Sequence, residues 1–341
     1  MSSGAPLRIL LSDAARTAIG ARLSRLLAER PYVLVAPDLP GADADMAFVS
    51  RDVTGLSTKH ETLSGTRIFY DALLQAPSLR WVQGHAAGAD RPVFQELMAR
   101  GVQVTTSSGA NAGVVVQTAL AGLLALARRF PQLMKAQRAH AWAPLIGTGL
   151  PRELAGQTAV IVGWGPIGQR LGAVLAALGL RVVAVRREAG PANADVEMVA
   201  FEDLQAVLPR ADWLVLVCPL TERTRGLVSA AALACLPDGA QLVNVARGEV
   251  VDEAALVSAL QSGKLAGAYL DVFAHEPLPA ASPLWDLPNV IVTPHSAGFS
   301  DGNAAKVEQL FLDNLASWIA GLPLRNSANA VSADGYPKAI P

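Results

Sequence analysis

Cysteine is scarce in this sequence, which contains only Cys218 and Cys235 among its 341 residues. Two cysteines cannot form a disulfide framework, and they have neither the number nor the spacing of a zinc site. A chain with so few cysteines is typical of a reducing compartment. We therefore expect no metal site and a cytoplasmic location.

Charge is sparse as well, because Asp, Glu, Lys and Arg together make up 17% of the chain, against the usual quarter. The 28 Lys and Arg residues nearly balance the 29 Asp and Glu residues, and no run of either sign occurs. Such a chain has no electrostatic footprint for nucleic acid or for an anionic membrane. We expect a small molecule as the partner.

Long hydrophobic runs are also missing, apart from the uncharged stretch at residues 112–127. A membrane-spanning helix needs about 20 apolar residues, and this shorter stretch includes Gln117 and Thr118. We predict a buried helix here, and a subunit interface is one place that would bury it. The N-terminal residues MSSGAPLRILLSD lack the basic and apolar regions of a secretory signal and predict a first strand instead.

The sequence does contain two series of short apolar runs, and its length is typical of two domains. Alternation of such runs with helical stretches predicts parallel sheets. The first series is RILLS from Arg8, YVLVA from Tyr32, MAFVS from Met46, RWVQG from Arg80 and VQVTT from Val102. Six strands are expected in the second series, namely TAVIV from Thr158, RVVAV from Arg181, WLVLV from Trp213, QLVNV from Gln241, AGAYLDV from Ala266 and NVIVT from Asn289.

Helix signals lie between these runs. Pro166 opens one helix, which ends at Gly179, and DEAALVSALQSG begins another on acidic residues. The apolar spacing of AKVEQLFLDNLASWIAG predicts an amphipathic helix that ends at Gly321 and Pro323 and returns to pack on the first domain. The tail from Asn326 to Pro341 is expected to be a loosely held strap.

The fold class is therefore α/β, with two doubly wound parallel-sheet domains and a cleft between them. We assign residues 1–108 and 302–341 to a flavodoxin-like substrate domain. Residues 109–301 form a Rossmann dinucleotide-binding domain, which includes a dimerisation helix and arm at about 111–150.

A glycine-rich loop follows TAVIV and opens the helix at Pro166. G-x-G-x-x-G is a weak motif alone, but between a strand and a helix it indicates dinucleotide binding. Gly163 permits the tight turn, Gly165 lets the pyrophosphate approach the backbone, and Gly168 allows close packing of helix on strand. Trp164, Pro166 and Ile167 complete the loop, and Pro166 removes one N–H donor from the helix N-terminus.

Arg186 and Arg187 end the next strand, where an acidic residue would accept a hydrogen bond from the ribose of NAD. Arginine there attracts a 2′-phosphate instead. A charge-assisted hydrogen bond contributes about 1.5 to 3 kcal/mol, which is roughly ten- to a hundredfold in affinity. We expect NADP(H) to be preferred, with NAD(H) still possible; the alternative is a pair of solvated arginines.

Three more motifs lie at the carboxyl ends of later strands, where open α/β sheets bind ligands: NVARG, LDVFAHEP and TPHSAG. With these motifs the chain resembles the D-isomer-specific 2-hydroxyacid dehydrogenases over nearly its whole length. The resemblance implies that Arg247, Glu276 and His295 are catalytic. The planar fork of arginine suits a substrate carboxylate, and histidine beside a carboxylate suits a general acid that protonates the carbonyl oxygen.

The resemblance also implies further contacts. Ala87 and Gly88 of HAAGAD would offer backbone amides to the substrate, together with Arg247, His295 and Trp142, and Trp142 is either a residue of the neighbouring subunit's pocket or a dimer anchor. Asp271 would accept a bond from the nicotinamide carboxamide. His85 is expected to be a loop residue, His275 solvated, and Cys218 a packing thiol. The remaining cofactor contacts implied are Cys218, Pro219, Thr224, Val245, Ala246, Arg247, His295 and Gly298.

Within the family, the arginine after the second strand, AWAPL around Trp142, LPDGA and EPLPAASPLW are most similar to the glyoxylate and hydroxypyruvate reductases. Gln117 departs from the family, which usually has glutamate there. Glu276 argues against formate dehydrogenase, and a reductase for another 2-oxo acid stays open. The rival from a different class is a redox-sensing, corepressor-like protein that binds the cofactor as a signal, and turnover of a small 2-oxo acid separates the two.

Overall fold

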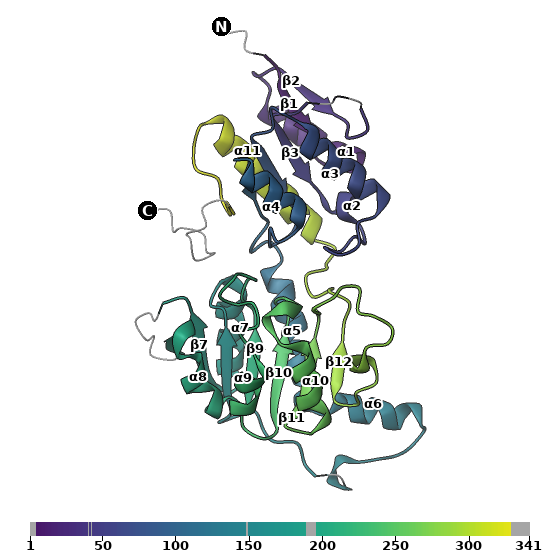
Figure 1. Ribbon diagram of the computed structural model, residues 1–341, viewed down its shortest axis with the longest axis vertical. Coiled ribbons are helices and arrows are strands. Elements are labelled where there is room, and N and C mark those ends of the chain that lie inside the picture. Colours follow the sequence, from purple (N-terminus) through teal and green to yellow (C-terminus); the bar gives the residue numbers. More distant parts are fainter. Residues whose placement is uncertain (1–4, 40, 42, 148, 189–195, 329–341) are drawn as a thin grey trace. The chain divides into compact units, whose positions relative to one another are not determined.

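The computed structural model describes residues 5–39, 41, 43–147, 149–188 and 196–328. The chain divides into two compact units, which we call unit 1 (Met1–Asn111 and Ser300–Pro341) and unit 2 (Ala112–Phe299). Each unit is built around its own parallel sheet (Figure 1). Both divisions fall within a few residues of the boundaries expected from the sequence.

Unit 1 contains a five-stranded parallel sheet of order β2-β1-β3-β4-β5. All five strands coincide with the first series of apolar runs, which confirms that prediction. The strands are β1 (Leu7–Leu10), β2 (Tyr32–Val35), β3 (Met46–Val49), β4 (Trp81–Gly84) and β5 (Gln103–Thr105). The helices are α1 (Asp13–Leu26), α2 (Arg51–Thr54), α3 (Ser64–Gln75), α4 (Pro92–Ala99) and α11 (Asn303–Ile319).

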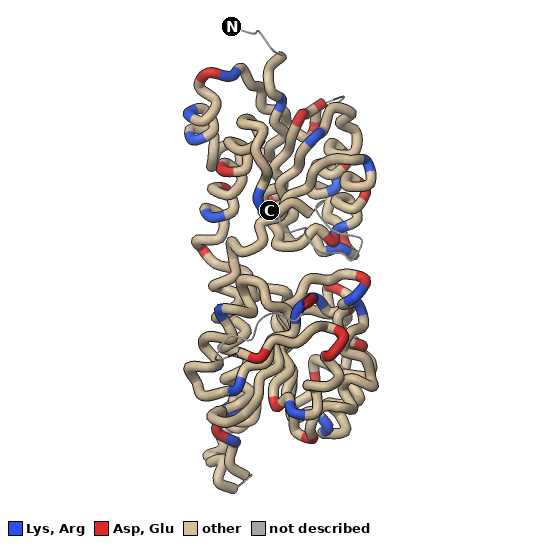
Figure 2. Tube along the Cα trace, turned by 90° about the vertical axis from the view of Figure 1, so that its left-hand side faces the viewer, with Lys and Arg blue, Asp and Glu red and all other residues tan. Residues whose placement is uncertain are grey.

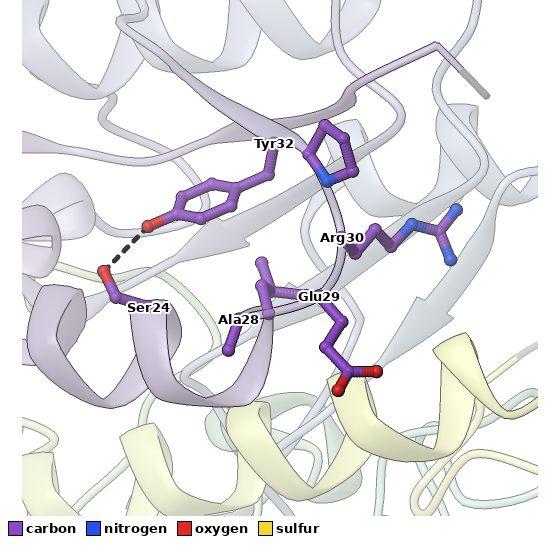
Figure 3. A pocket seen from close by; sticks show the side chains of 7 residues that line it. Ser24, Ala28, Glu29, Arg30 and Tyr32 are labelled. Carbon is purple, nitrogen blue, oxygen red and sulfur yellow. Dashed lines mark hydrogen bonds between the residues drawn. The ribbon is translucent and has the colours of Figure 1, made fainter. Parts of the chain in front are cut away.

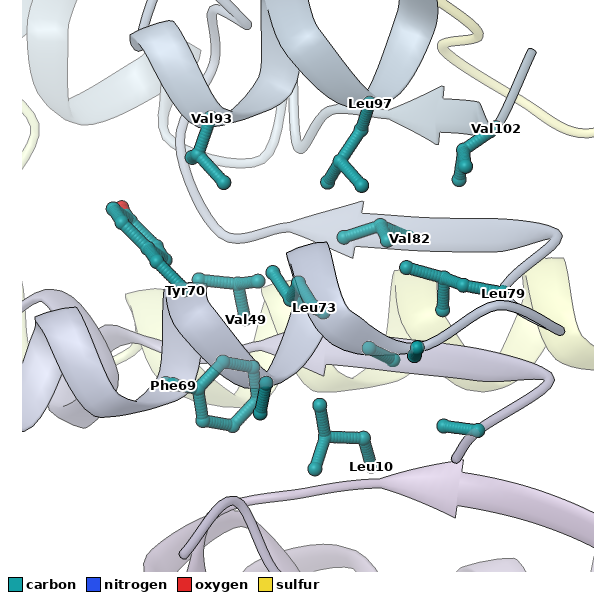
Figure 4. Close-up of a cluster of buried hydrophobic side chains, with 14 of the residues drawn as sticks. Leu10, Val49, Phe69, Tyr70, Leu73, Leu79, Val82, Val93, Leu97 and Val102 are labelled. Carbon is teal, nitrogen blue, oxygen red and sulfur yellow. The ribbon is translucent and has the colours of Figure 1, made fainter. Parts of the chain in front are cut away.

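Helices cover both faces of this sheet. On one face, Phe69 and Leu73 of α3 and Leu97 of α4 pack with Val82 of β4 (Figure 4). On the other face, α1 and α11 enclose a second cluster, in which the ring of Phe311 stacks on Phe48 and on Trp81. The last helix therefore returns to the first domain, as its amphipathic pattern predicts.

The C-terminal segment is held more firmly than the sequence suggests. Ala328 donates to Val104 at 2.7 Å, and Thr106 donates to Asn326 at 3.0 Å, which makes a short antiparallel pairing along the outer edge of β5. The buried Asn314 of α11 bonds the backbone of Arg325 through both atoms of its amide. The expectation of a loose strap is thus wrong for residues 326–328, and residues 329–341 lie outside the described part.

Unit 2 contains a parallel sheet of seven strands, of order β12-β11-β10-β9-β6-β7-β8. Six of them match the second series of runs, and β8 is an additional strand that we did not predict. Its sequence, VEMVA, includes the charged Glu197, and only Val199 is buried, because β8 lies at the sheet edge and pairs with β7 alone. The strands are β6 (Thr158–Val162), β7 (Arg181–Arg186), β8 (Val196–Ala200), β9 (Trp213–Leu216), β10 (Ala240–Asn244), β11 (Leu265–Leu270) and β12 (Val290–Val292).

The helices of unit 2 fill out the doubly wound pattern. α5 covers residues 112–127 as predicted, and it packs with α7 on one face of the sheet. The α-helices are α5 (Ala112–Ala127), α6 (Phe130–Arg138), α7 (Pro166–Ala177), α8 (Leu204–Val207), α9 (Ala230–Cys235) and α10 (Glu253–Gln261). Short 3-10 helices are η1 (Leu145–Gly147), η2 (Phe201–Asp203), η3 (Leu208–Arg210), η4 (Gly248–Val250) and η5 (Pro283–Trp285).

No single helix among the described residues is long and apolar enough to cross a membrane. Helices α5 and α6 meet the length and composition criteria only as a pair, and they are bent by 71° at the break between them. Half of the α5 side chains are buried inside unit 2, which is the arrangement of a core helix.

Charged residues of both signs are interspersed along both units (Figure 2). Two surface hollows of about 440 Å³ each lie on unit 1. One lies where α1 leads into β2, and there the Ser24 hydroxyl bonds the Tyr32 hydroxyl at 2.8 Å (Figure 3). The other lies between α1 and α11. Neither hollow includes a residue that the sequence singles out as a site candidate.

The packing of α5 on β11 depends on the absence of a side chain at Gly122. A Cβ atom there would lie 2.3 Å from the ring of Tyr269. Gly122→Ala is expected to destabilise the protein by about 1 to 3 kcal/mol through overpacking, measured by urea unfolding. Gly20→Ala is the matched control, because that position in α1 has open space around it and alanine favours the helix. Equal stability of the two variants would contradict the packing argument.

Candidate active site

The glycine loop between β6 and α7 is fixed by two close backbone approaches. A Cβ on Gly163, whose φ is +108°, would lie 2.7 Å from the backbone nitrogen of Cys218. A Cβ on Gly168 would lie 2.1 Å from the Gly163 carbonyl oxygen. Both positions therefore require glycine, for turn conformation and for packing.

The middle glycine has a different environment. A Cβ on Gly165, the N-cap residue of α7, would meet nothing within 4 Å, so the loop is open on that side. The indole of Trp164 is turned toward α7, where it packs over Gly172, and Ile167 joins the same cluster. Open space beside the N-terminus of a twelve-residue helix fits a dinucleotide pyrophosphate, with Pro166 contributing no N–H.

Arg186 lies beside this loop because of the strand register. β7 runs parallel to β6, and the Gly163 N–H donates to the Val185 carbonyl at 2.8 Å, directly before Arg186. The Arg186 side chain is exposed and makes no hydrogen bond or ion pair with any described residue. Arg187 forms an ion pair of 3.6 Å with Glu188. The two arginines therefore differ in how available they are to a ligand.

His295 and Glu276 form a hydrogen-bonded pair. The Nδ1 atom of His295 lies 2.8 Å from Oε2 of Glu276. The histidine side chain is 47% exposed and the carboxylate only 11%, so the pair presents the ring to solvent and keeps the acid inside. Because Nδ1 is engaged, Nε2 is the ring nitrogen left for a ligand. The structure thus brings together two of the residues that the sequence singled out.

Glu276 is held from more than one side. Its Oε1 accepts from the Phe273 N–H at 3.1 Å. Burial would raise the pKa of Glu276, but the bonds and the positive charge around it hold the pKa below its usual value; the His295 bond is the largest of these effects, and Arg247 adds to them. The carboxylate therefore stays ionised at neutral pH and can stabilise a positive charge on His295.

Arg247 lies in the turn after β10, and the glycine that follows it lets this turn approach the loop of the His295–Glu276 pair. A Cβ on Gly248 would lie 1.8 Å from the Phe273 carbonyl carbon, so only glycine lets this turn approach the loop that carries Glu276. The Asn244 side chain bonds both the Ala246 N–H and the Arg247 carbonyl, which fixes the turn. The guanidinium of Arg247 donates from Nη1 to the Ala246 carbonyl at 2.7 Å, and its positive charge helps to lower the pKa of Glu276 and opposes the rise in the pKa of Cys218.

Asp271 is buried, with 1% of its surface exposed, and holds the backbone around His295. Its carbonyl accepts from the His295 N–H at 2.8 Å, and its carboxylate accepts from the Ser296 and Ala297 N–H groups at 2.8 and 2.9 Å. His295 has a φ of +51°, in the left-handed region that non-glycine residues rarely adopt. Successive N–H groups around such a residue form a concave anion site, which Asp271 occupies.

The remaining predicted cofactor residues lie at the carboxyl ends of β9, β10 and β12. Burial raises the pKa of the Cys218 thiol to about 12, so this cysteine is unreactive packing, as expected. Thr224 is buried and donates to the Pro219 carbonyl at 2.7 Å, which shapes the loop after β9. Val245 extends the β10 ladder to Leu216, Ala246 is buried, and Gly298 is half-buried beyond Ala297.

The other candidates lie on α5, in loops of unit 2 and in unit 1. His275 is exposed, with Nδ1 3.3 Å from the Pro277 carbonyl oxygen, as expected for a solvated histidine. Gln117 is exposed on α5, and Trp142 is 97% exposed. In unit 1, Ala87 and Gly88 lie in the loop after β4.

His85 begins that loop of unit 1, and its ring is packed inward, with Nε2 2.7 Å from the Thr54 hydroxyl. Burial, with the charges of Arg51 and Arg91, lowers the pKa of His85 to about 4. The ring is therefore neutral at neutral pH, and it serves the packing of this loop.

Three supporting residues escaped the sequence argument. Gly248 follows Arg247, Glu253 resembles an ordinary acidic helix start, and Thr293 precedes Pro294 and His295. In the structure, Glu253 accepts from the Ala274 N–H at 2.9 Å, and Thr293 donates to Asp271 at 2.6 Å. The only sequence signal for the roles of these three residues was their closeness to the motifs, because each of their contacts joins segments that are distant in sequence.

The chain is similar to known proteins over most of its length. Residues 120–297 match the family model described as "D-isomer specific 2-hydroxyacid dehydrogenase, NAD binding domain". The D-3-phosphoglycerate dehydrogenase of Mycobacterium leprae is 39% identical over 235 residues, which cover 68% of this chain and 43% of that protein. The chain thus matches less than half of that relative. A glyoxylate reductase of Korarchaeum cryptofilum is 35% identical, with 72% of this chain and 75% of that protein covered.

Solved structures give the same result. A D-isomer specific 2-hydroxyacid dehydrogenase from Xanthobacter autotrophicus, in complex with NADPH and MES, is 31% identical with a TM-score of 0.74, covering 95% of this chain and 98% of that one. An NADPH-dependent glyoxylate/hydroxypyruvate reductase from Sinorhizobium meliloti, with NADP and sulfate bound, is 28% identical with a TM-score of 0.73, covering 97% and 100%. By its motifs, its fold and these matches, the chain belongs to the D-isomer specific 2-hydroxyacid dehydrogenase family.

Proposed function

We propose that this protein is an NADPH-dependent reductase of small 2-oxo acids, with glyoxylate or hydroxypyruvate as substrate. The observation that carries the proposal is the His295–Glu276 pair at 2.8 Å, together with the turn of Arg247, which the close approach of Gly248 to Phe273 brings against the loop that carries Glu276. A proton donor beside a cation for the substrate carboxylate is what reduction of a 2-oxo acid requires from the protein.

The residues divide the work as follows. Arg247 binds the substrate carboxylate and orients the carbonyl, while His295 donates a proton from Nε2 to the carbonyl oxygen. Glu276 holds the imidazole through Nδ1 and stabilises its protonated form. The reduced nicotinamide, when bound, supplies the hydride. Backbone N–H groups of Ala87 and Gly88 are proposed as further donors to the substrate, and Asp271 as the acceptor for the nicotinamide carboxamide.

The preference for NADPH rests on Arg186, the last residue of β7, and on Arg187, which follows it. Arg186 is exposed beside the glycine loop, and Arg187 follows it, where a 2′-phosphate of the bound nucleotide would need cationic partners. The solved relatives from Xanthobacter autotrophicus and Sinorhizobium meliloti were crystallised with NADPH and NADP, which supports the same choice. NADH stays possible as a weaker cofactor.

We further propose that the protein forms a homodimer and works in the cytoplasm. The arm from α6 onward carries apolar side chains exposed to solvent, namely Phe130 (50%), Met134 (47%), Trp142 (97%), Ile146 (79%) and Leu150 (71%). Exposed apolar side chains grouped on one segment mark an interaction surface, and a second copy would cover them.

The experiment that tests the function is a panel of 2-oxo acids assayed with NADPH. Glyoxylate and hydroxypyruvate are expected to be reduced, and His295→Ala is expected to lower kcat by about 10² to 10⁴, because a general acid contributes that much. The affinity for NADPH, measured by fluorescence titration, should stay nearly unchanged. Binding of NADPH without turnover of any 2-oxo acid would favour the redox-sensing alternative, and equal loss of turnover and cofactor affinity would contradict the role of His295.

Cofactor choice is tested by Arg186→Ala. Loss of a charge-assisted bond to the 2′-phosphate is expected to weaken NADPH binding by about ten- to a hundredfold, while NADH binding changes little. Isothermal titration with each cofactor gives both values. Arg181→Ala, at the other end of the same strand, is the matched control. Parallel weakening of both cofactors by Arg186→Ala would show a general, not a phosphate-specific, effect.

The dimer is tested by light scattering at micromolar concentration. Wild-type protein is expected at twice the mass of the chain, and Phe130→Glu combined with Met134→Glu is expected to shift it toward the monomer, because two charges would have to be buried. A wild-type protein that is monomeric at these concentrations would overturn the proposal.

A further inference from the structure

A chain of three hydrogen-bonded side chains supports the loop that carries His295. Tyr269 lies on β11, Asp271 directly follows β11, and Thr293 directly follows β12. The Tyr269 and Thr293 hydroxyls lie 2.7 Å apart, and the Thr293 hydroxyl donates to Oδ1 of Asp271 at 2.6 Å. A threonine hydroxyl has a single proton, which goes to the carboxylate, so Tyr269 is the donor to Thr293. The chain therefore has one direction, from Tyr269 through Thr293 to Asp271.

This chain fixes the orientation of a carboxylate that receives consecutive backbone N–H groups. Oδ1 of Asp271 accepts from Thr293 and from the Ser296 N–H, and Oδ2 accepts from the Ala297 N–H at 2.9 Å. The carbonyl of the same residue accepts from the His295 N–H. Rotation of this carboxylate would loosen two of the bonds that hold His295 in its left-handed conformation.

That left-handed conformation has a cost. A non-glycine residue persists there only where the surrounding structure enforces the conformation. The His295 side chain is half exposed, and Glu276 is the side chain that holds its ring, so the direction of the ring depends largely on the backbone. A shift of that backbone would move Nε2 relative to a substrate held by Arg247, and small errors in placement cost catalysis heavily.

We propose that Thr293 is a positioning residue, which fixes the Asp271 carboxylate and through it the orientation of His295. Thr293 itself is not among the residues expected to contact cofactor or substrate. This inference rests on the proposed function for its kinetic readout, but the geometry that it describes belongs to unit 2 alone and can be measured without turnover.

The test compares Thr293→Val, which keeps the shape and removes the hydroxyl, with Thr293→Ser, which keeps the hydroxyl. We expect Thr293→Val to lower kcat with the best 2-oxo acid at least tenfold. Because Asp271 is also the proposed acceptor for the nicotinamide carboxamide, NADPH affinity is expected to fall as well, but by a smaller factor than kcat. Thr293→Ser should restore kcat to within threefold. Loss confined to NADPH affinity, an unchanged kcat in Thr293→Val, or equal losses in both variants would each overturn the proposal.

Two further measurements keep the proposal testable. Tyr269→Phe removes only the hydroxyl that bonds Thr293, and this variant is expected to lower kcat about threefold. If Thr293→Val does not fold, Tyr269→Phe takes its place in the test. An unchanged kcat in Tyr269→Phe would then overturn the proposal. The second readout is the NMR signal of the His295 Cε1–H in isotope-labelled protein, which should shift in Thr293→Val and stay at the wild-type position in Thr293→Ser. An unshifted signal in Thr293→Val overturns the proposal whether or not the wild type reduces any 2-oxo acid, so failure of the proposed function remains distinguishable.

Discussion

The candidate site depends above all on one buried carboxylate. Asp271 accepts the N–H groups of His295, Ser296 and Ala297, the first through its carbonyl and the others through its side chain. Burial raises the pKa of its carboxyl, and the hydrogen bonds act against that rise. A buried acid with so many donors is stable only while every donor is in place, because each unsatisfied polar group would cost about 1 to 3 kcal/mol. The histidine turn and the acid thus stabilise each other.

The second constraint is the close approach of backbone segments. Gly163, Gly168 and Gly248 each stand where a Cβ would collide with backbone atoms. Gly163 lets the loop after β6 approach the residues that follow β9, and Gly168 lets α7 pack against that loop. Gly248 brings the turn of Arg247 against the loop that carries Glu276. Gly165 differs, because its side is open. Glycine therefore permits close backbone packing at three of these positions, and at the fourth it leaves open space beside the loop.

Most of the fold and part of the candidate site could be predicted from the sequence. Buried parallel strands are continuous apolar runs, so all five strands of unit 1 and six of the seven in unit 2 were found, and the uncharged run of α5 was matched at both ends. β8 was missed because an edge strand with a charged residue lacks that pattern. Arg247, Glu276 and His295 were identified by their motifs. Thr293 and Glu253 act through contacts between distant segments, which no local pattern encodes.

The pairing of residues 326–328 with β5 has a consequence for solubility. An outer strand with unsatisfied N–H and C=O groups is a template for β-pairing with other molecules. Here the backbone of Val104 and Thr106 is already bonded by Ala328 and Asn326. The end of the described chain thereby blocks one margin of the sheet against aggregation, using main-chain groups that carry no part of the chemistry.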